Sequence, residues 1–389
     1  MSVLPESGII SFARGIPAPD MFPADELAEA AQRAFARHRA TALNYGPPAG
    51  FGPLREWIAA EHGAAPEQIV ITPGSYILLT FLVRVLLEKP APVLVEVPSY
   101  DRAVSLLRTT GARILPVRRD ESGLDFARLE HYLATGERPA FCYLLPTFHN
   151  PTGTTMTTAD RERLADLAMA HDLLLVEDDP YGPLRFDGEE PPSLRSLLAA
   201  RGAGHLSVFM SSFSKVVAPG LRVGYGVLPE QLAQRVAAVA LGTYVSPPLW
   251  PQAEIYEFLA GGFLPAHLSR VRGLLRVRRD ALVTRLAAGL NGIGQDGIGH
   301  EGAGPRWSNP DGGYFLWLEL PAQLSAADLL ADCERAGVTF VPGWGFFADG
   351  GGGSSARLCF SFHSAEEIAD GADRLVAAAR GRLVGTGAA

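Results

Sequence analysis

The rarest charged residue in this sequence is lysine. Of the 34 lysine and arginine residues, only Lys89 and Lys215 are lysines. A lysine amine can lose its proton and act as a nucleophile, which an arginine guanidinium cannot do. Lys89 precedes a proline at a polar helix end and is expected at the surface, whereas Lys215 follows an apolar segment in a stretch of small residues. The sequence therefore singles out Lys215 as a candidate nucleophile.

Other reactive or hydrogen-bonding side chains also follow short apolar segments. Asn150 comes after the segment 140–145, and Asp178 and Tyr181 come after the segment 173–177. Gly74 and Ser75 come just before a predicted helix. The predicted strand 206–210 is followed by Ser212, Ser214, Lys215 and Arg222. Ligands of an open parallel sheet bind beyond the carboxyl ends of its strands. We therefore expect these residues to share one rim of a sheet.

These residue types suit a phosphorylated pyridine aldehyde. The amine of Lys215 would condense with the aldehyde as a Schiff base. A carboxylate opposite the ring nitrogen keeps that nitrogen protonated, which makes the ring an electron sink. Gly74 and Ser75, at the start of a helix, offer backbone N–H groups to a phosphate. Ser212 and Arg222 add hydroxyl and guanidinium donors.

The elements that must position these residues alternate along the chain. From about residue 50 to 230, apolar or β-branched segments alternate with amphipathic segments, which predicts an α/β domain with a mostly parallel sheet. The predicted strands are 92–97, 112–117, 140–145, 173–177, 206–210 and 223–227, and helices are predicted at 100–109 and 158–171. A smaller α+β domain should follow, with a long helix at 267–290, strands at 313–320, 338–341 and 357–362, and helices at 326–336 and 365–380. We predict residues 1–45 as a segment packing on the small domain, 46–275 as the large domain and 276–389 as the small domain.

Composition and charge narrow the class of protein. The net charge of −8 disfavours a nucleic-acid partner. Apolar runs are shorter than the ~20 residues of a membrane span, and we see no signal peptide at the N-terminus. Cys142, Cys333 and Cys359 lie far apart without metal-ligand spacing. The expectation is a protein of the reducing cytoplasm with no metal site.

Six segments together resemble the fold-type I, pyridoxal-phosphate-dependent aminotransferases of class I and II, over nearly the whole chain. In chain order they are SFARGIPAP (11–19), YGPPAG (45–50), NPTG (150–153), DDPY (178–181), SFSK (212–215) with APGLRVGY (218–225), and RLCFS (357–361). The resemblance is to the branch with 2-aminoadipate aminotransferases and the aminotransferase-like domain of MocR-type regulators. It implies the fold of these transferases, pyridoxal 5'-phosphate as cofactor, and ping-pong transfer of an amino group between an α-amino acid and a 2-oxo acid.

The resemblance also implies a role for each site residue. Lys215 would form the Schiff base and carry the proton, Asp178 would pair with the ring nitrogen, and Arg357 would grip the substrate α-carboxylate. Asn150 and Tyr181 would face the ring hydroxyl, with Asn150 also near the substrate. The remaining implied contacts are those of Gly74, Ser75, Tyr76, Ser212, Ser214 and Arg222 with the cofactor, of Tyr100 stacked on its ring, of Gly15 beside the substrate, and of Tyr45 with the phosphate of a neighbouring subunit. A homodimer with shared active sites follows from the last of these.

Four features of the sequence lie outside these implied roles or depart from the usual pattern. Arg14 stands where this branch usually has glycine, so its guanidinium could bind a second substrate carboxylate, block part of the pocket or point to solvent. Tyr76 stands where glutamine is common, which leaves backbone phosphate contacts intact. His149 is expected to be a packed or hydrogen-bonded neighbour of the site instead of an acid or base. A solvated helix face is expected for Arg270, Arg272, Arg276, Arg278 and Arg279.

Two alternatives to an aminotransferase stay open from the sequence. The first is another reaction of the same cofactor on an amino acid, such as decarboxylation, β- or γ-replacement, oxidation or carbon–carbon bond formation in a biosynthetic pathway. The second is an effector-sensing module like that of MocR-type regulators. The motif at 11–19 begins close to residue 1, which disfavours the second alternative because those regulators carry a DNA-binding head before it.

Overall fold

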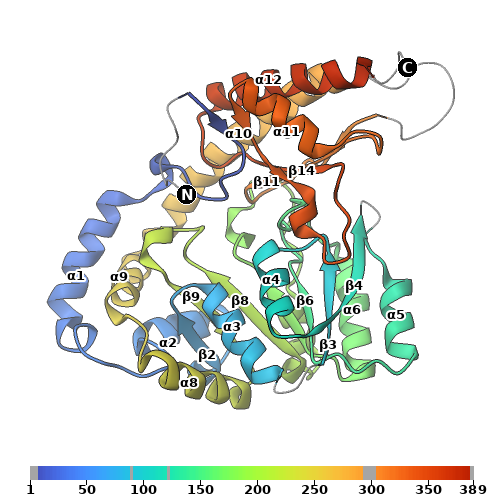
Figure 1. The fold of residues 1–389 in the computed structure, drawn as a ribbon. Helices are drawn as coiled ribbons and strands as arrows, with labels where there is room; N and C mark the ends of the chain where they lie inside the picture. The colour runs from blue at the N-terminus through green and yellow to red at the C-terminus, as the bar shows by residue number, and fades with distance from the viewer. Residues whose placement is uncertain (1–7, 88–90, 121–122, 292–303, 386–389) are drawn as a thin grey trace.

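A central sheet with helices on both faces, joined to a smaller antiparallel sheet, makes up the molecule (Figure 1). The computed structural model describes residues 8–87, 91–120, 123–291 and 304–385, so Lys89 lies outside the described residues. In the order of the central sheet, the strands are β2 (Ile69–Thr72), β9 (Gly224–Val227), β8 (Ser207–Ser212), β7 (Leu175–Asp178), β6 (Cys142–Leu144), β3 (Pro92–Val97), β4 (Arg113–Asp120) and β5 (Gly123–Leu124). Strands β8, β7, β6, β3 and β4 are mutually parallel, and antiparallel pairs occur only toward the edges of this sheet. The prediction of a mostly parallel α/β sheet is confirmed.

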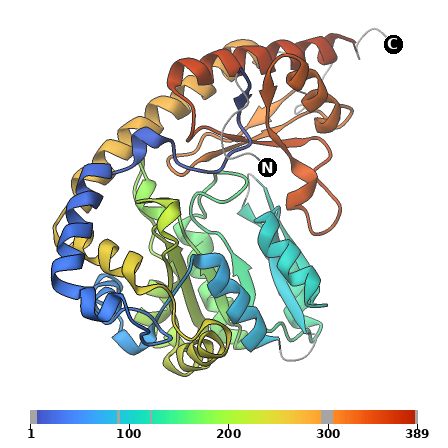
Figure 2. The same cartoon turned by 60° about the vertical axis from the view of Figure 1, so that its left-hand side comes forward.

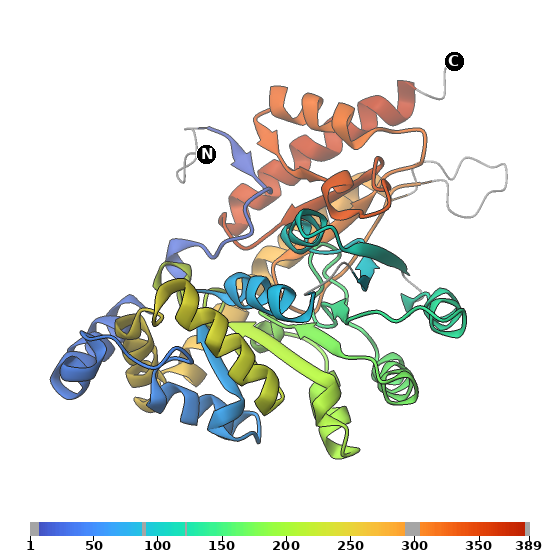
Figure 3. The same ribbon diagram turned by 60° about the horizontal axis from the view of Figure 1, so that its bottom comes forward.

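Both faces of the central sheet are buried, which explains its continuously apolar strands. Val93 and Val95 pack on one face and Leu94 on the other, because successive side chains of a strand point to opposite sides. One face is covered by α3 (Ser75–Leu86), α4 (Asp101–Thr109) and α8 (Glu230–Tyr244), and the other by α5 (Phe126–Ala134), α6 (Thr158–His171) and α7 (Leu194–Ala200). Figure 3 shows the helices on the two sides.

The C-terminal part contains a small antiparallel sheet. Its strands, in order, are β10 (Arg306–Trp307), β11 (Phe315–Glu319), β14 (Ser355–Cys359) and β13 (Val341–Pro342), and its helices are α11 (Ala326–Arg335) and α12 (Ala365–Gly385). The 27-residue helix α10 (Leu264–Leu290) runs from beside the large sheet to α12 (Figure 2). No helix among the described residues is both long and apolar enough to cross a membrane.

The N-terminal segment contacts two regions. Strand β1 (Ile10–Ser11) pairs in parallel with β12 (Val338–Thr339) of the C-terminal part. Helix α1 (Ala24–Ala42) packs against α9 (Leu249–Ala260), and the short α2 (Gly52–Glu61) also packs on α9. The division at residues 45 and 275 stays a prediction.

Several predicted boundaries were shifted by strand pairing. The segment 338–341 forms two short strands instead of one, because β12 pairs with β1 and β13 pairs with β14. Strand β7 ends at Asp178 and β8 extends to Ser212, so both of these site residues lie within the sheet at its rim. Strand β2 was not predicted, and it pairs antiparallel with β9.

The expectation of a solvated arginine face on the long helix is wrong for two residues. Arg278 and Arg279 are buried, because α10 crosses between the two parts of the molecule and both parts cover these positions. Arg278 donates to the carbonyl of Ser361 at 3.2 Å and to Asp20 at 2.7 Å. Arg279 donates to the carbonyl of Pro310 at 2.5 Å. These two arginines therefore tie the helix to the surrounding chain.

Candidate active site

One pocket of about 350 Å³ gathers most of the predicted residues. It opens at the carboxyl ends of β6, β7 and β8 and is closed on one side by β11 and β14 of the small sheet. The predicted residues that line it are Gly15, Gly74, Ser75, Tyr76, Tyr100, Asn150, Asp178, Tyr181, Ser212, Ser214, Lys215, Arg222 and Arg357. The remaining lining residues are Asp101, Arg102, Leu145, Pro180 and Phe315.

Lys215 reaches this pocket from the turn after β8. Its Nζ donates a hydrogen bond to the carbonyl oxygen of Gly15 at 2.6 Å. The pKa of the amine is lowered to about 8, chiefly by burial; Cys359 opposes this shift, and the positive charges of Arg357 and Arg222 add to it. A larger fraction of this amine than of an exposed lysine is thus neutral and nucleophilic close to neutral pH.

Asp178 ends strand β7 and is almost fully buried. Its Oδ2 accepts a hydrogen bond from the hydroxyl of Tyr143 on β6 at 2.7 Å, whereas its Oδ1 is buried with no hydrogen-bond partner. Burial raises the pKa of Asp178 to about 7, the Tyr143 hydrogen bond lowers it, and neighbouring Asp179 raises it. An unpaired carboxylate oxygen in a pocket is suited to a cationic group of a ligand.

Backbone N–H groups and a guanidinium converge at the start of α3. Gly74 precedes the helix with φ +94°, a conformation that favours glycine. A Cβ on Gly74 would lie 2.3 Å from Nη2 of Arg222, and a Cβ on Gly224 would lie 2.2 Å from the backbone nitrogen of Ser75. Arg222 also lies 3.4 Å from Oγ of Ser214. This is the donor set that phosphate groups bind at helix N-termini.

Arg357 approaches from β14 on the opposite side of the pocket. It is buried, and its Nη1 donates to Oδ1 of Asn150 at 2.9 Å while its Nη2 donates to the carbonyl of Ala13 at 3.2 Å. Its guanidinium lies 4.3 Å from the ring centre of Phe315, and its Nε has no partner. Asn150 therefore fixes the orientation of the guanidinium in the pocket.

Three tyrosines border the pocket. Tyr181 is buried against the rings of Tyr314 and Phe315. Tyr100 lies directly before α4, and burial raises the pKa of its hydroxyl to about 12, with Asp101 and Asp178 adding to the effect. Tyr76 lies in the first turn of α3. All three hydroxyls can donate hydrogen bonds at neutral pH.

The structure does not bring two predicted residues to this pocket. Tyr45 is 81% exposed and does not line the pocket of its own chain. The guanidinium of Arg14 lies 5.2 Å from the ring centre of Phe362, outside the lining. His149 is fully buried, with Nδ1 2.9 Å from Oγ1 of Thr152 and Nε2 3.4 Å from Glu96. It is a packed neighbour of Asn150 and does not line the pocket.

Sequence reasoning missed several residues that shape the pocket. Asp101 and Arg102 follow Tyr100 directly, and their position at a strand-to-helix turn was the available signal. For Tyr143, the signal was a phenol within a buried strand, since a buried hydroxyl needs a partner. Among the described residues, no group of three or more His, Cys, Asp or Glu side chains could hold a metal ion, and all three cysteines are buried and free.

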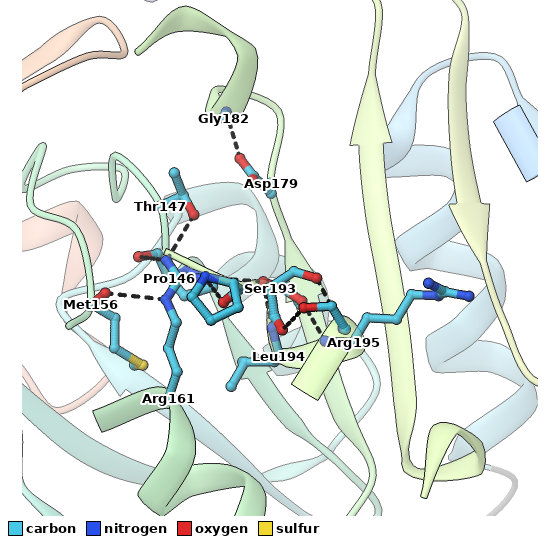
Figure 4. Close-up of polar contacts among 12 residues, drawn as sticks. Pro146, Thr147, Met156, Arg161, Asp179, Gly182, Ser193, Leu194 and Arg195 are labelled. Carbon is cyan, nitrogen blue, oxygen red and sulfur yellow. Dashed lines mark hydrogen bonds and ion pairs between the residues drawn. The ribbon is translucent and has the colours of Figure 1, made fainter. Parts of the chain in front are cut away.

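A buried arginine behind the pocket holds the loop that carries Asn150. Arg161 on α6 donates to the carbonyls of Pro146, Met156 and Pro192 and to Oγ1 of Thr147, at 2.8–3.2 Å (Figure 4). Pro146 and Met156 stand at the two ends of the loop, so one guanidinium fastens both.

Comparisons with known proteins fit this geometry. The model of the family described as aminotransferase class I and II matches residues 7–375. The chain belongs to the aminotransferase class I and II family. It is 40% identical over 377 residues to a 2-aminoadipate transaminase of Thermus thermophilus, covering 97% of this chain and 91% of that protein. It is 30% identical to aromatic-amino-acid aminotransferase 1 of Thermococcus litoralis, covering 96% and 89% of the two chains.

Solved structures of this family agree in fold. The α-aminoadipate aminotransferase LysN of Thermus thermophilus, complexed with N-(5'-phosphopyridoxyl)-L-leucine, superposes with a TM-score of 0.89 at 38% identity and covers 98% of this chain and 94% of its own. This chain thus has the fold-type I architecture that its sequence predicted. Its cofactor is pyridoxal 5'-phosphate, and it is a transferase of amino groups.

Proposed function

We propose that Lys215, Asp178 and Arg357 form the catalytic centre of an aminotransferase that takes an α-amino acid as donor and a 2-oxo acid as acceptor. One observation carries the proposal: the amine of Lys215, the unpartnered Oδ1 of Asp178 and the helix start at Gly74–Ser75 open into one pocket. An aldehyde, a ring nitrogen and a phosphate are the three groups of pyridoxal phosphate that these features suit. The residues therefore fit the cofactor.

Each residue then has a defined task. Bound pyridoxal phosphate supplies an aldehyde that condenses with amines and a ring that accepts the electron pair left at the substrate Cα. Lys215 would hold the cofactor through its Nζ and, when released by the substrate amine, would take and return the Cα proton there. Asp178 would keep the ring nitrogen protonated through its charged Oδ1. Gly74, Ser75, Ser212, Ser214 and Arg222 would hold the phosphate, and Asn150, Tyr181 and Tyr100 would orient the ring.

The substrate class follows from Arg357. A guanidinium with a fixed planar orientation binds a carboxylate through two parallel hydrogen bonds. Because Asn150 and Ala13 fix this guanidinium on the side of the pocket opposite the phosphate donors, we propose that it binds the α-carboxylate. Gly15, which accepts a hydrogen bond from Lys215, would lie beside the same substrate. The guanidinium of Arg14 lies over the ring of Phe362 and outside the pocket lining, so no substrate contact is proposed for it.

We further propose a homodimer whose sites are shared, working in the cytoplasm. Tyr45 is one of several large apolar side chains that are exposed, and the others include Leu43, Leu241 and Val245. Tyr45 is exposed and does not line the pocket of its own chain, which supports a place in the pocket of a second copy. The two relatives described above are named for different amino acids, so the donor must be identified by experiment.

The test is a titration of the loaded enzyme with a panel of amino acids and no acceptor. An aminotransferase releases up to one 2-oxo acid per site, keeps the nitrogen as pyridoxamine phosphate, and stops until an acceptor is added. Release of CO₂ or continued turnover without an acceptor would instead support the other reactions of this cofactor. A preparation that stays colourless after addition of pyridoxal phosphate would overturn the role of Lys215.

A further inference from the structure

Tyr143 occupies a position that the proposed roles leave unexplained. It lies on β6, is fully buried and donates to Oδ2 of Asp178 at 2.7 Å. Tyr143 is in register with Val176 of the neighbouring β7, and Asp178 lies two residues further along β7. Because strand side chains alternate, Tyr143 and Asp178 point to the same face of the sheet. The hydrogen bond therefore follows from the strand register and does not depend on a flexible loop.

The two oxygens of Asp178 have different surroundings. Oδ2 is held by the phenol, whereas Oδ1 has no partner and belongs to a residue that lines the pocket. The other groups that act on this carboxyl are Asp179 in the following turn and Tyr100 at the start of α4. Tyr143 is the one hydrogen-bond donor to this carboxyl among the described residues. A donor favours the charged form of a carboxyl against the effect of burial.

We propose that Tyr143 is a positioning residue that favours the charged form of Asp178 and directs its free oxygen at the ring nitrogen of the cofactor. The inference rests on the proposed role of Asp178. Burial and Asp178 hold the pKa of Tyr143 well above its usual range, so its hydroxyl remains a donor at neutral pH. Without this donor, the effects of burial and of Asp179 would remain, and the pKa of Asp178 would rise above about 7.

The test measures cofactor binding to the apoenzyme instead of turnover. The probes are pyridoxal phosphate and its carbocyclic analogue, in which CH replaces the ring nitrogen. Wild-type enzyme should prefer pyridoxal phosphate, and the preference should fall as the pH drops through about 7 and Asp178 takes up a proton. In Tyr143→Phe the preference at pH 7 should fall about three- to tenfold, and the pH of half-loss should rise. An unchanged preference and an unchanged midpoint in Tyr143→Phe would overturn the inference.

Two further variants separate the possible failures. Tyr225→Phe removes a partly buried hydroxyl that contacts Nε2 of His62 at 3.1 Å, outside the pocket, and should leave the preference unchanged. Asp178→Asn should abolish the preference. If Asp178→Asn leaves it intact, the proposed role of Asp178 fails, and if only Tyr143→Phe is without effect, the inference on Tyr143 alone fails.

A substitution of nearly the same size at Tyr143 tests the inference even if Tyr143→Phe does not fold. Replacing Tyr143 by 3-fluorotyrosine retains the hydroxyl and makes it a stronger donor, which should move the midpoint to lower pH. An unchanged midpoint in this variant would also overturn the inference.

Discussion

Oδ1 of Asn150 and Nη1 of Arg357 are 2.9 Å apart, although 207 residues separate them in the chain. Asn150 lies in the loop after β6 of the large sheet, and Arg357 lies on β14 of the small sheet. Both side chains are buried, and each satisfies the hydrogen-bonding group of the other. The contact therefore joins the two parts of the molecule at the pocket. A residue proposed to bind the cofactor thereby sets the orientation of one proposed to bind the substrate.

This contact predicts the effect of Arg357→Lys. Lysine keeps the charge but loses the two-pronged geometry, so KM for the amino acid should rise about 10- to 100-fold while pyridoxal phosphate still binds. Steady-state kinetics and a cofactor titration measure the two effects. Arg113 on β4 forms an exposed pair with Glu137, so Arg113→Lys is the matched control and should change neither. A normal KM in Arg357→Lys would remove this residue from substrate binding.

The pKa of Lys215 predicts how fast the apoenzyme captures pyridoxal phosphate at different pH. The neutral amine is the nucleophile, and burial lowers its pKa to about 8, so the capture rate should rise with pH and level off above about 8. In Arg357→Leu one of the smaller causes of the shift is lost, and the profile should move to higher pH. Stopped-flow absorbance follows the reaction. A rate that keeps rising to pH 10 would contradict the lowered pKa.

Loss of the Lys215 amine should abolish covalent capture. Lys215→Arg preserves a positive charge that cannot be deprotonated, so borohydride reduction should add no cofactor mass to the protein. Turnover should fall by about a thousandfold or more, since the nucleophile and the proton carrier are lost together. Cofactor mass on another lysine of the variant would argue against Lys215.

Arg161 should contribute to the free energy of unfolding because its guanidinium donates hydrogen bonds to buried oxygen atoms. Arg161→Ala leaves the carbonyls of Pro146 and Met156 without this donor and removes the charge 3.6 Å from the buried Glu177. Breaking a buried pair typically costs about 3–5 kcal/mol. Arg163→Ala removes an exposed arginine of the same helix, α6, which pairs with Glu130 on α5, and it should cost less than about 1 kcal/mol. Urea unfolding of both variants checks the contrast, and equal losses would refute it.

The shared-site proposal predicts complementation between two inactive chains. A Lys215→Ala chain retains Tyr45, and a Tyr45→Ala chain retains Lys215. Random mixing makes about half of the dimers hybrid, each with one complete site of two. At limiting cofactor the unseparated mixture should therefore recover about a quarter of wild-type activity, and the purified hybrid about half. Recovery is measured after co-expression and separation by two affinity tags. No recovery in a purified hybrid would place Tyr45 outside the partner's site.

The sequence by itself determined the fold class and most of the pocket. Strands buried on both faces must be continuously apolar, and polar residues must follow them where the sheet ends, so the local pattern located Asn150, Asp178 and Lys215 on one rim. The scarcity of lysine left one chemically sensible candidate. Helix α6 and strand β3 have the predicted bounds because capping and apolar patterns are local signals.

Contacts between distant segments were decided only by the tertiary structure. Tyr143 meets Asp178 because of strand register, and Arg278 and Arg279 are buried because α10 lies between two parts of the molecule. The split of 338–341 into two strands likewise depends on β1 and β14. Residues next to each other in sequence constrain the backbone directly. The partner of a buried hydroxyl, guanidinium or strand edge is instead set by which distant segment packs there, and the local pattern does not encode it.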